Sequence, residues 1–146
     1  MTDARHDNFQ QTAGFSLLEL LVVVAVFSII MSMSVAGYRQ YITRASRVDA
    51  TALLLRVAAA QERHYLEQNT YTDDLVALGF PDARSEKGYY ALAVAPALGG
   101  LVIGYTATAT VVAGERQSDD AKCQALSVNE SGLRASTPEE PEICWG

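Results

Sequence analysis

Proline is scarce in this chain and does not occur in its first half. The 146 residues include four prolines, and the first of them is Pro81. A helix in the first half therefore contains no proline kink, because only proline combines a missing backbone donor with a clash against the preceding turn. The length is enough for one modest hydrophobic core, and a second full domain is not expected.

Histidine and cysteine are also few, which limits the chemistry open to the chain. There are two histidines and two cysteines, and they do not have the spacing of a zinc site. The sequence has no P-loop, no nucleophile elbow and no glycine-rich dinucleotide turn. We interpret His64 and the acidic pairs 73–74 and 119–120 as solvated or partly packed groups. The sequence therefore predicts neither an enzyme nor a cofactor.

Charged residues are missing from one long segment, Leu20 to Tyr38, whereas they recur regularly from Arg39 onward. As a helix, this segment would be roughly 28 Å long, close to the thickness of the hydrocarbon core of a bilayer. Three interpretations compete: a removed secretory signal, an ordinary single-span anchor, and a membrane helix that later serves another purpose. The apolar run is too long for a secretory signal, and no A-x-A-like cleavage site follows it.

One carboxylate, that of Glu19, lies at the edge of this segment. An acidic side chain at the centre of a bilayer costs about 2.5 to 3.5 kcal/mol by insertion scales and less near the interface, so it is a candidate for a functional role. An ordinary anchor gives Glu19 no purpose. The alternative interpretation is that Glu19 lies near the lipid headgroups and is tolerated there.

The residues GFSLLELLVVVAV, which begin at Gly14, closely resemble the signature of type IV prepilins. In that family a dedicated peptidase cuts after the glycine, the new amino terminus is methylated, and a glutamate stands at the fifth mature position. The resemblance implies cleavage between Gly14 and Phe15 and N-methylation of Phe15. It also implies that Glu19 takes part in assembly. Two departures are Ser16, where threonine is commoner, and the lack of Lys or Arg beside the glycine.

Cleavage would create a positive charge close to the negative charge of Glu19, because Phe15 would then carry an ammonium group. When such helices leave the lipid and bundle together, an unpaired carboxylate in an apolar interior is costly and a paired one much less so. A pair between Glu19 and the amine of a displaced neighbour would set the axial register, as buried polar residues do in coiled coils. A local alternative, which can operate as well, is that Glu19 favours the positive end of its own helix dipole.

We expect one helix to run from about Phe15 to Glu67 and to become amphipathic after Gly37. In its second half, one side is apolar at helical spacing and is expected to pack on a globular partner. The residues of this predicted packing face are Tyr38, Tyr41, Ile42, Ala45, Val48, Ala52, Leu55 and Ala59. The residues expected on the opposite, charged face are Arg39, Arg44, Arg47, Asp49, Arg56, Glu62 and Arg63.

Strand signals follow the helix. Residues 89–95 and 101–112 alternate in hydrophobicity, and CQALSVNESGLRAS, from Cys123, predicts two further strands around a turn at 129–132. Within 101–112, the residues expected on one face are Ile103, Tyr105, Ala107, Ala109 and Val111. Four successive strands with short connections predict an antiparallel sheet over 89–136, covered on its apolar side by the amphipathic half of the helix. The predicted fold class is α+β.

These elements divide the chain into three parts: a removed leader over 1–14, a transmembrane and filament-core helix over 15–37, and a globular head over 38–146. The head would contain the helix half 38–67 and a connecting loop, 68–88, with one short helical turn near 73–77.

The two cysteines, Cys123 and Cys144, lie in the part expected outside the cytoplasm. Two cysteines in an exported domain usually form one bridge. The sequence therefore predicts a disulfide-bounded region over 123–144. Closing this loop contributes roughly 3 kcal/mol on the chain-entropy model.

Further motifs extend the resemblance over nearly the whole chain. QERHYLEQNTYT, LGF, SEKGYYAL, YTATAT and the terminal CWG look like those of the PilE-type minor pilins of bacterial type IVa pili. The resemblance implies the type IV pilin fold, with a long helix, a four-stranded sheet and a carboxy-terminal disulfide loop. It also implies a structural, minor subunit of a fibre that serves motility or adhesion.

The same resemblance implies where the chain works and with what. The prepilin would cross the bacterial inner membrane once, be processed by prepilin peptidase, and then enter an extracellular pilus. Its expected partners are other pilin subunits, the peptidase, the inner-membrane assembly machinery, and membrane lipid before assembly.

The charge distribution argues against a nucleic-acid partner. The formal net charge is -6, and residues 115–146 carry seven acidic against three basic side chains. Phosphate binding needs clustered cations. No nucleic acid is therefore expected.

Two alternatives to a pilus subunit stay open. A pseudopilin of type II secretion shares the amino-terminal features, although the two-cysteine loop favours a pilus subunit. A single-pass membrane receptor or binding module would keep the helix as a permanent anchor and never assemble.

Overall fold

The computed structural model describes residues 14–146, apart from the side chains of residues 33–36 and 39. The predicted leader therefore lies outside the described residues, except for Gly14. The chain divides into two units, Met1–Tyr38 and Arg39–Gly146, which we call the N-terminal unit and the head. One helix, α1 (Leu17–Gln68), contributes to both.

Helix α1 is continuous because its sequence contains no strong breaker: Gly37 is its one glycine, and it has no proline. It ends at Gln68 because Asn69 adopts a positive φ of 53°, the left-handed conformation that terminates many helices. The backbone N–H of Asn69 still donates to the carbonyl of Tyr65, at 2.8 Å. The predicted bounds agree with the observed ones to within two residues.

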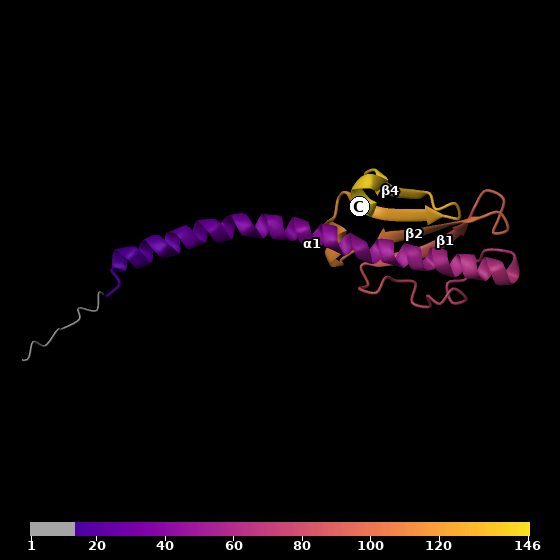
Figure 1. The fold of residues 1–146 in the computed structure, drawn as a ribbon, viewed down its shortest axis with the longest axis horizontal. Coiled ribbons are helices and arrows are strands. Elements are labelled where there is room, and N and C mark those ends of the chain that lie inside the picture. Colours follow the sequence, from indigo (N-terminus) through magenta and orange to yellow (C-terminus); the bar gives the residue numbers. More distant parts are fainter. Residues whose placement is uncertain (1–13) are drawn as a thin grey trace, which may run out of the picture. The chain divides into compact units, whose positions relative to one another are not determined.

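The head contains a four-stranded antiparallel sheet whose strands follow one another in space as they do in the sequence (Figure 1). The strands are β1 (Tyr90–Pro96), β2 (Tyr105–Val111), β3 (Cys123–Asn129) and β4 (Arg134–Pro138). In the register, Ala109 of β2 lies opposite both Leu92 of β1 and Leu126 of β3. The predicted α+β class, with a long helix followed by four antiparallel strands, is confirmed.

The second strand is shorter than predicted. Residues 101–104 form part of the turn before β2, and Ile103, which we expected to face the core, is 65% exposed. The pair Gly99 and Gly100, both at positive φ, directs this turn, and the N–H of Ile103 donates back to the carbonyl of Gly100 at 3.1 Å. Pairing with β1 therefore begins only at Tyr105, and the apolar residues before it were wrongly assigned to the strand.

The core of the head lies between α1 and one face of the sheet. Figure 1 shows the C-terminal part of α1, in magenta, running along the strands. The helix contributes four side chains that are at most 4% exposed, namely Ala50, Leu53, Leu54 and Val57. The sheet contributes Tyr90, Leu92, Tyr105, Ala107, Ala109, Leu126 and Val128. The spacing of the helical residues is that of one face of an α-helix.

This buried face of α1 is not the one that the sequence predicted. Of the predicted packing residues, Tyr41 is 69% exposed, Val48 63% and Leu55 50%. At about 100° per residue, Val48 and the buried Val57 point to opposite sides of the helix. The prediction was wrong because α1 is apolar on two opposite sides, and periodicity does not say which side a sheet covers.

Tyrosines make up much of the core and its edge. The ring of Tyr71 stacks on that of Tyr65, with 4.7 Å between centroids, and lies 5.0 Å from that of Tyr105. Burial raises the pKa of Tyr90 and raises the pKa of Tyr105 to about 12, because a phenolate is poorly solvated in an apolar interior. Burial, and then the charge of Glu62, raise the pKa of Tyr71. These phenols therefore stay neutral at physiological pH.

The segment between α1 and β1 is irregular and is fixed to the helix by Gln61. The buried amide of Gln61 donates to the carbonyl of Thr72 at 2.6 Å and accepts from the N–H of Thr72 at 3.1 Å. The helical turn expected near 73–77 occurs as a single turn, in which the N–H of Leu78 donates to the carbonyl of Asp74 at 3.2 Å. The side chain of Asp74 accepts from Val76 N–H at 2.9 Å and stabilises this turn.

Two short helices were not predicted. A 3-10 helix, η1 (Arg116–Asp119), lies between β2 and β3, and α2 (Pro141–Trp145) follows β4. Pro141 stands at the start of α2, where a fixed φ suits a helix and a missing N–H costs nothing. Such short elements depend on tertiary contacts rather than on a periodic pattern, so the sequence gives little sign of them.

Candidate functional site

The predicted processing site precedes α1. Gly14, Phe15 and Ser16 have no regular secondary structure, and the carbonyl of Ser16 accepts from Leu20 N–H at 3.2 Å. Gly14 is exposed, and Phe15 is 82% exposed. A peptide bond in exposed, irregular chain is open to a peptidase. The geometry is therefore compatible with cleavage between Gly14 and Phe15, and both the cleavage and the N-methylation of Phe15 stay predictions.

The N-terminal unit exposes its apolar side chains. From Phe15 to Met31 the large apolar residues are between 46% and 82% exposed, and Glu19, also exposed, is the one charged residue among them. The hydroxyls of Ser28 and Ser32 donate to the carbonyls of Val24 and Ile29, each at 2.8 Å. These internal bonds lower the cost of surrounding the two serines with apolar groups. Such a large apolar surface indicates an interaction site.

Across the part of the chain that the structure describes, no helix has the length and apolar character needed to cross a membrane. The predicted membrane segment, 20–38, includes the side chains of residues 33–36, which lie outside the described part. The inner-membrane stage stays a prediction.

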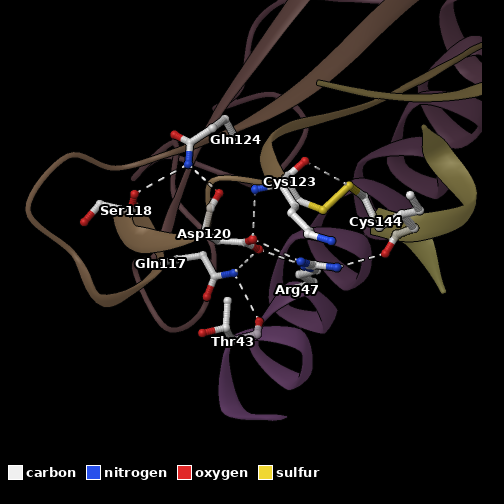
Figure 2. A network of polar contacts seen from close by, with 10 residues as sticks. Thr43, Arg47, Gln117, Ser118, Asp120, Cys123, Gln124 and Cys144 are labelled. Carbon is white, nitrogen blue, oxygen red and sulfur yellow. Dashed lines mark hydrogen bonds and ion pairs between the residues drawn. A yellow bond between two sulfur atoms is a disulfide. The ribbon is translucent and has the colours of Figure 1, made fainter. Parts of the chain in front are cut away.

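A disulfide links the start of β3 to α2 (Figure 2). The sulfur atoms of Cys123 and Cys144 are 2.03 Å apart, their Cα atoms are 5.7 Å apart, and both residues are buried. The indole N–H of Trp145 donates to the carbonyl of Ala135 at 3.0 Å, which holds α2 against β4. The predicted disulfide-bonded loop is confirmed.

A buried ion pair adjoins the disulfide and connects it to α1 (Figure 2). The guanidinium of Arg47 donates to Asp120 through Nε, at 2.7 Å to Oδ2, and through Nη2, at 3.0 Å to Oδ1. Its Nη1 donates to the carbonyl of Ile143 at 2.9 Å. Arg47 is 8% exposed and Asp120 4%. A two-pronged contact of this kind is among the strongest that a buried charge can make.

The carboxylate of Asp120 has further donors (Figure 2). Gln117 Nε2 donates to its Oδ2 at 2.9 Å and to the carbonyl of Thr43 at 3.2 Å, and the N–H of Lys122 donates to Oδ1 at 3.2 Å. Both oxygens of the buried carboxylate are therefore satisfied, as burial of a charge requires. The network joins α1, η1 and α2, and its role is to hold these elements together.

This network corrects two expectations from the sequence. Arg47 was assigned to the solvated, charged face of the helix, and Asp120 to a solvated acidic pair. Arg47 in fact precedes Ala50 by three residues and Leu54 by seven, on the same side of α1. That spacing was the one signal that could have identified it. His64 lies at the edge of the head, with its Nδ1 2.9 Å from the carbonyl of Thr70.

Two family models match the chain. Residues 36–127 match a model described as "Type IV minor pilin ComP, DNA uptake sequence receptor". Residues 10–35 match one described as "Prokaryotic N-terminal methylation motif". The second match includes Gly14, Phe15 and Glu19, and the first includes most of the head.

Individual relatives are type IV pilins. The chain is 30% identical over 77 residues to the type IV major pilin protein PilE of Neisseria gonorrhoeae, covering 53% of this chain and 46% of that protein. It is 27% identical over 82 residues to the type IV major pilin protein PilA of Myxococcus xanthus, covering 56% and 37%. The matches thus span about half or less of the length of these relatives.

A solved structure of a type IV pilin from Shewanella oneidensis is similar to this one. The match covers 71% of this chain and 98% of that chain, with 27% sequence identity and a TM-score of 0.48. Because the first family model covers more than half of the sequence, the chain belongs to the type IV pilin family, whose members are structural proteins and not enzymes.

Proposed function

We propose that this pilin is a minor subunit of a type IV pilus and that it assembles through the exposed apolar start of α1. The observation that carries the proposal is the surface from Phe15 to Met31, which is apolar on every side and has one charge, Glu19. Lipid can cover this surface before assembly, and the same segments of other subunits can cover it afterwards. The minor role is supported by the description of the family model that matches most of the head.

Processing would change the electrostatics of this segment. Cleavage after Gly14 leaves a cationic amine on Phe15, one helical turn before Glu19. In a bundle of apolar helices, the amine of one subunit and the carboxylate of Glu19 in a displaced neighbour would each lower the free-energy cost of burying the other. Pairing at one axial displacement only would fix the register of the fibre.

Intact-mass spectrometry of the chain isolated from membranes and from sheared fibres tests this proposal. We expect residues 1–14 to be missing and one methyl group to be present. The matched variant Gly14→Val places a branched side chain at the cleaved bond and should keep residues 1–14. An unprocessed wild-type chain would favour a permanent anchor, and a processed chain that never occurs in fibres would favour a secretion pseudopilin.

A second candidate function is DNA binding during uptake. It is favoured by the description of the matched family model, which names a DNA uptake sequence receptor. The acidic C-terminal region had led us to expect no nucleic-acid partner. The head has a pocket of about 340 Å³ lined by Trp145, by the exposed cations Arg44 and Lys122, and by Arg47, whose charge is paired with that of Asp120. The guanidinium of Arg134 lies 4.9 Å from the centre of the Trp145 ring. Cations beside an aromatic ring are suited to phosphates and unstacked bases.

The double variant Arg44→Gln/Lys122→Gln should weaken DNA binding several-fold. If both cations contact phosphates of duplex DNA, the slope of log affinity against log salt concentration should fall by about 1.8, since each contact contributes about 0.9. The measurement is fluorescence anisotropy of labelled DNA with the detergent-purified chain. The control Arg63→Gln/Lys87→Gln changes the net charge equally at two exposed positions elsewhere. Equal losses in both variants would contradict a site at this pocket.

A further inference from the structure

The connection between β1 and β2 has no polar side chain. It consists of residues 97–104, with the sequence ALGGLVIG, and we call it the apolar loop. Leu98 is fully exposed, and Val102 and Ile103 are each 65% exposed. Surface connections are normally rich in polar residues, because they lie in water. A run of exposed apolar side chains at such a place indicates a contact with something other than water.

The apolar loop lies at the end of the head where α1 terminates (Figure 1). The N–H of Tyr71, which follows α1, donates to the carbonyl of Leu101 at 3.0 Å. The turn between β3 and β4 lies at the same end, because the four strands are antiparallel and consecutive. A Cβ atom added to Gly104 would lie 2.6 Å from Cδ of Glu130 in that turn, so the turn packs against the loop. The large exposed apolar residues from these three segments are Leu66, Leu98, Val102, Ile103 and Leu133.

Hydrogen bonds within the apolar loop give it a fixed shape. The N–H of Ala97 donates to the carbonyl of Gly104 at 3.0 Å and closes the loop at its base. The N–H of Gly100 donates to the carbonyl of Ala97 at 2.9 Å, and that of Gly104 donates to the carbonyl of Gly100 at 3.2 Å. Leu101 is half-buried and packs against the core. Backbone groups that already have partners cost less to remove from water, so the loop can enter an apolar medium as it stands.

The chemistry of the apolar loop suits lipid better than it suits a protein surface. Protein interfaces contain about one hydrogen bond per 100–200 Å² and draw much of their binding energy from Trp, Tyr and Arg. The loop has none of these residue types, and its side chains offer no donor or acceptor. Acyl chains need neither, and they adapt to any apolar shape. Aliphatic side chains that project into water therefore gain free energy on entering them.

We propose that the apolar loop inserts into the surface of a lipid membrane and places Leu98, Val102 and Ile103 among the acyl chains. The loop has no charged side chain, and the carboxylate of Glu130 lies against it. Anionic headgroups therefore add no attraction, and the preferred surface is zwitterionic, such as phosphatidylcholine. The contact belongs to the head, goes beyond the proposed assembly and does not depend on it.

Vesicle flotation tests the apolar loop with the full chain. The chain is held in phosphatidylcholine nanodiscs, whose lipid covers the N-terminal segment, and phosphatidylcholine vesicles are then added. We expect Leu98→Asn/Val102→Asn to lower vesicle binding at least tenfold relative to wild type, because two amides would have to enter the acyl chains. Empty nanodiscs give the background.

The matched control is Leu55→Asn/Val76→Asn, which changes the same residue types at exposed positions of α1 and of the segment after it. It should bind vesicles as wild type does. Both double variants should keep the melting temperature of the head, since none of the four residues belongs to the core.

Fluorescence quenching locates the apolar loop in the bilayer. Leu98→Trp places an indole on the loop and Val76→Trp places one elsewhere, each in addition to Trp145, the one tryptophan of the chain. With vesicles whose acyl chains carry bromine, the emission of Leu98→Trp should be quenched and that of Val76→Trp should stay near the wild-type level. The quenching should be equal at low and high salt, because no charge takes part in the contact.

Three outcomes would overturn the proposal. Wild-type nanodiscs that bind vesicles no better than empty ones would exclude lipid and leave the apolar loop to a protein partner. Equal losses in both double variants would show that the loop has no special part in binding. Binding that rises with phosphatidylglycerol content and falls with salt would indicate a contact through cations elsewhere. Neither measurement uses cleavage or fibres, so failure here leaves the proposed assembly standing.

Discussion

Glu19→Val is expected to insert into the membrane as wild type does and to be at least tenfold depleted from fibres. Insertion should not suffer, because valine removes the cost of placing an acid in a bilayer, which is at most about 2.5 to 3.5 kcal/mol and smaller near the interface. Assembly should suffer because the amine of a neighbouring Phe15 would be buried without its partner, which costs several kcal/mol. The measurement is the ratio of the chain in sheared fibres to that in the membrane fraction.

Two further variants define what Glu19 does. Glu19→Gln keeps the size and hydrogen-bonding capacity without the charge, so it should be depleted like Glu19→Val if charge pairing sets the register. Leu20→Val, at the next position, changes apolar packing only and should assemble. Normal incorporation of Glu19→Val into fibres would show that Glu19 does not set the register. If Glu19→Gln entered fibres normally and Glu19→Val did not, a hydrogen bond and not an ion pair would set it.

Arg47→Ala is expected to destabilise the head by about 3 to 5 kcal/mol, the usual loss when one member of a buried ion pair is removed. The carboxylate of Asp120, which is 4% exposed in the wild type, would keep only Gln117 and a backbone N–H as donors. For a domain of this size, that loss corresponds to a fall in melting temperature of about 10 °C or more. Urea unfolding under oxidising conditions measures it with the disulfide intact.

Two comparisons show whether the charge or the packing is responsible. Arg44→Ala removes an exposed arginine one turn earlier in α1 and should change stability by less than about 0.5 kcal/mol. Arg47→Met/Asp120→Leu replaces both charges by apolar groups and should be more stable than Arg47→Ala, because no unpaired charge remains. If Arg47→Ala lowered the free energy of unfolding by no more than Arg44→Ala does, the network would not contribute to the stability of the head.

The sequence allowed much of the fold to be predicted, because each successful inference rested on a strong local signal. A long stretch without proline and with one glycine gave the bounds of α1 to within two residues. Alternation and turn residues gave four strands in the right order. With only Cys123 and Cys144 available, the disulfide pairing followed as soon as an exported domain was assumed. The motif at Gly14, Phe15 and Glu19 was found through resemblance, and its chemistry is still untested.

The failures at Arg47, at Asp120 and on the packing face of α1 share a physical cause, because they concern contacts between distant parts of the chain. Arg47 and Asp120 are 73 residues apart in sequence, and the spacing of Arg47 from Ala50 and Leu54 is the one local sign that either residue is buried. The prediction of the side of α1 that packs on the sheet was wrong because the helix has two apolar sides of similar quality. Val48 belongs to one of them and Val57 to the other. The sequence alone does not say which of these two apolar sides the sheet covers.

The attachment of Arg47 to both Asp120 and Ile143 also bears on mechanical load. Tension along α1 would reach the head near its first turns, where Arg47 transfers part of it to a segment closed by the bond between Cys123 and Cys144. That covalent ring limits how far the C-terminal segment can be drawn out. Resistance to pulling would therefore depend in part on the Arg47 ion pair and on the disulfide, together with the packing of α1 on the sheet.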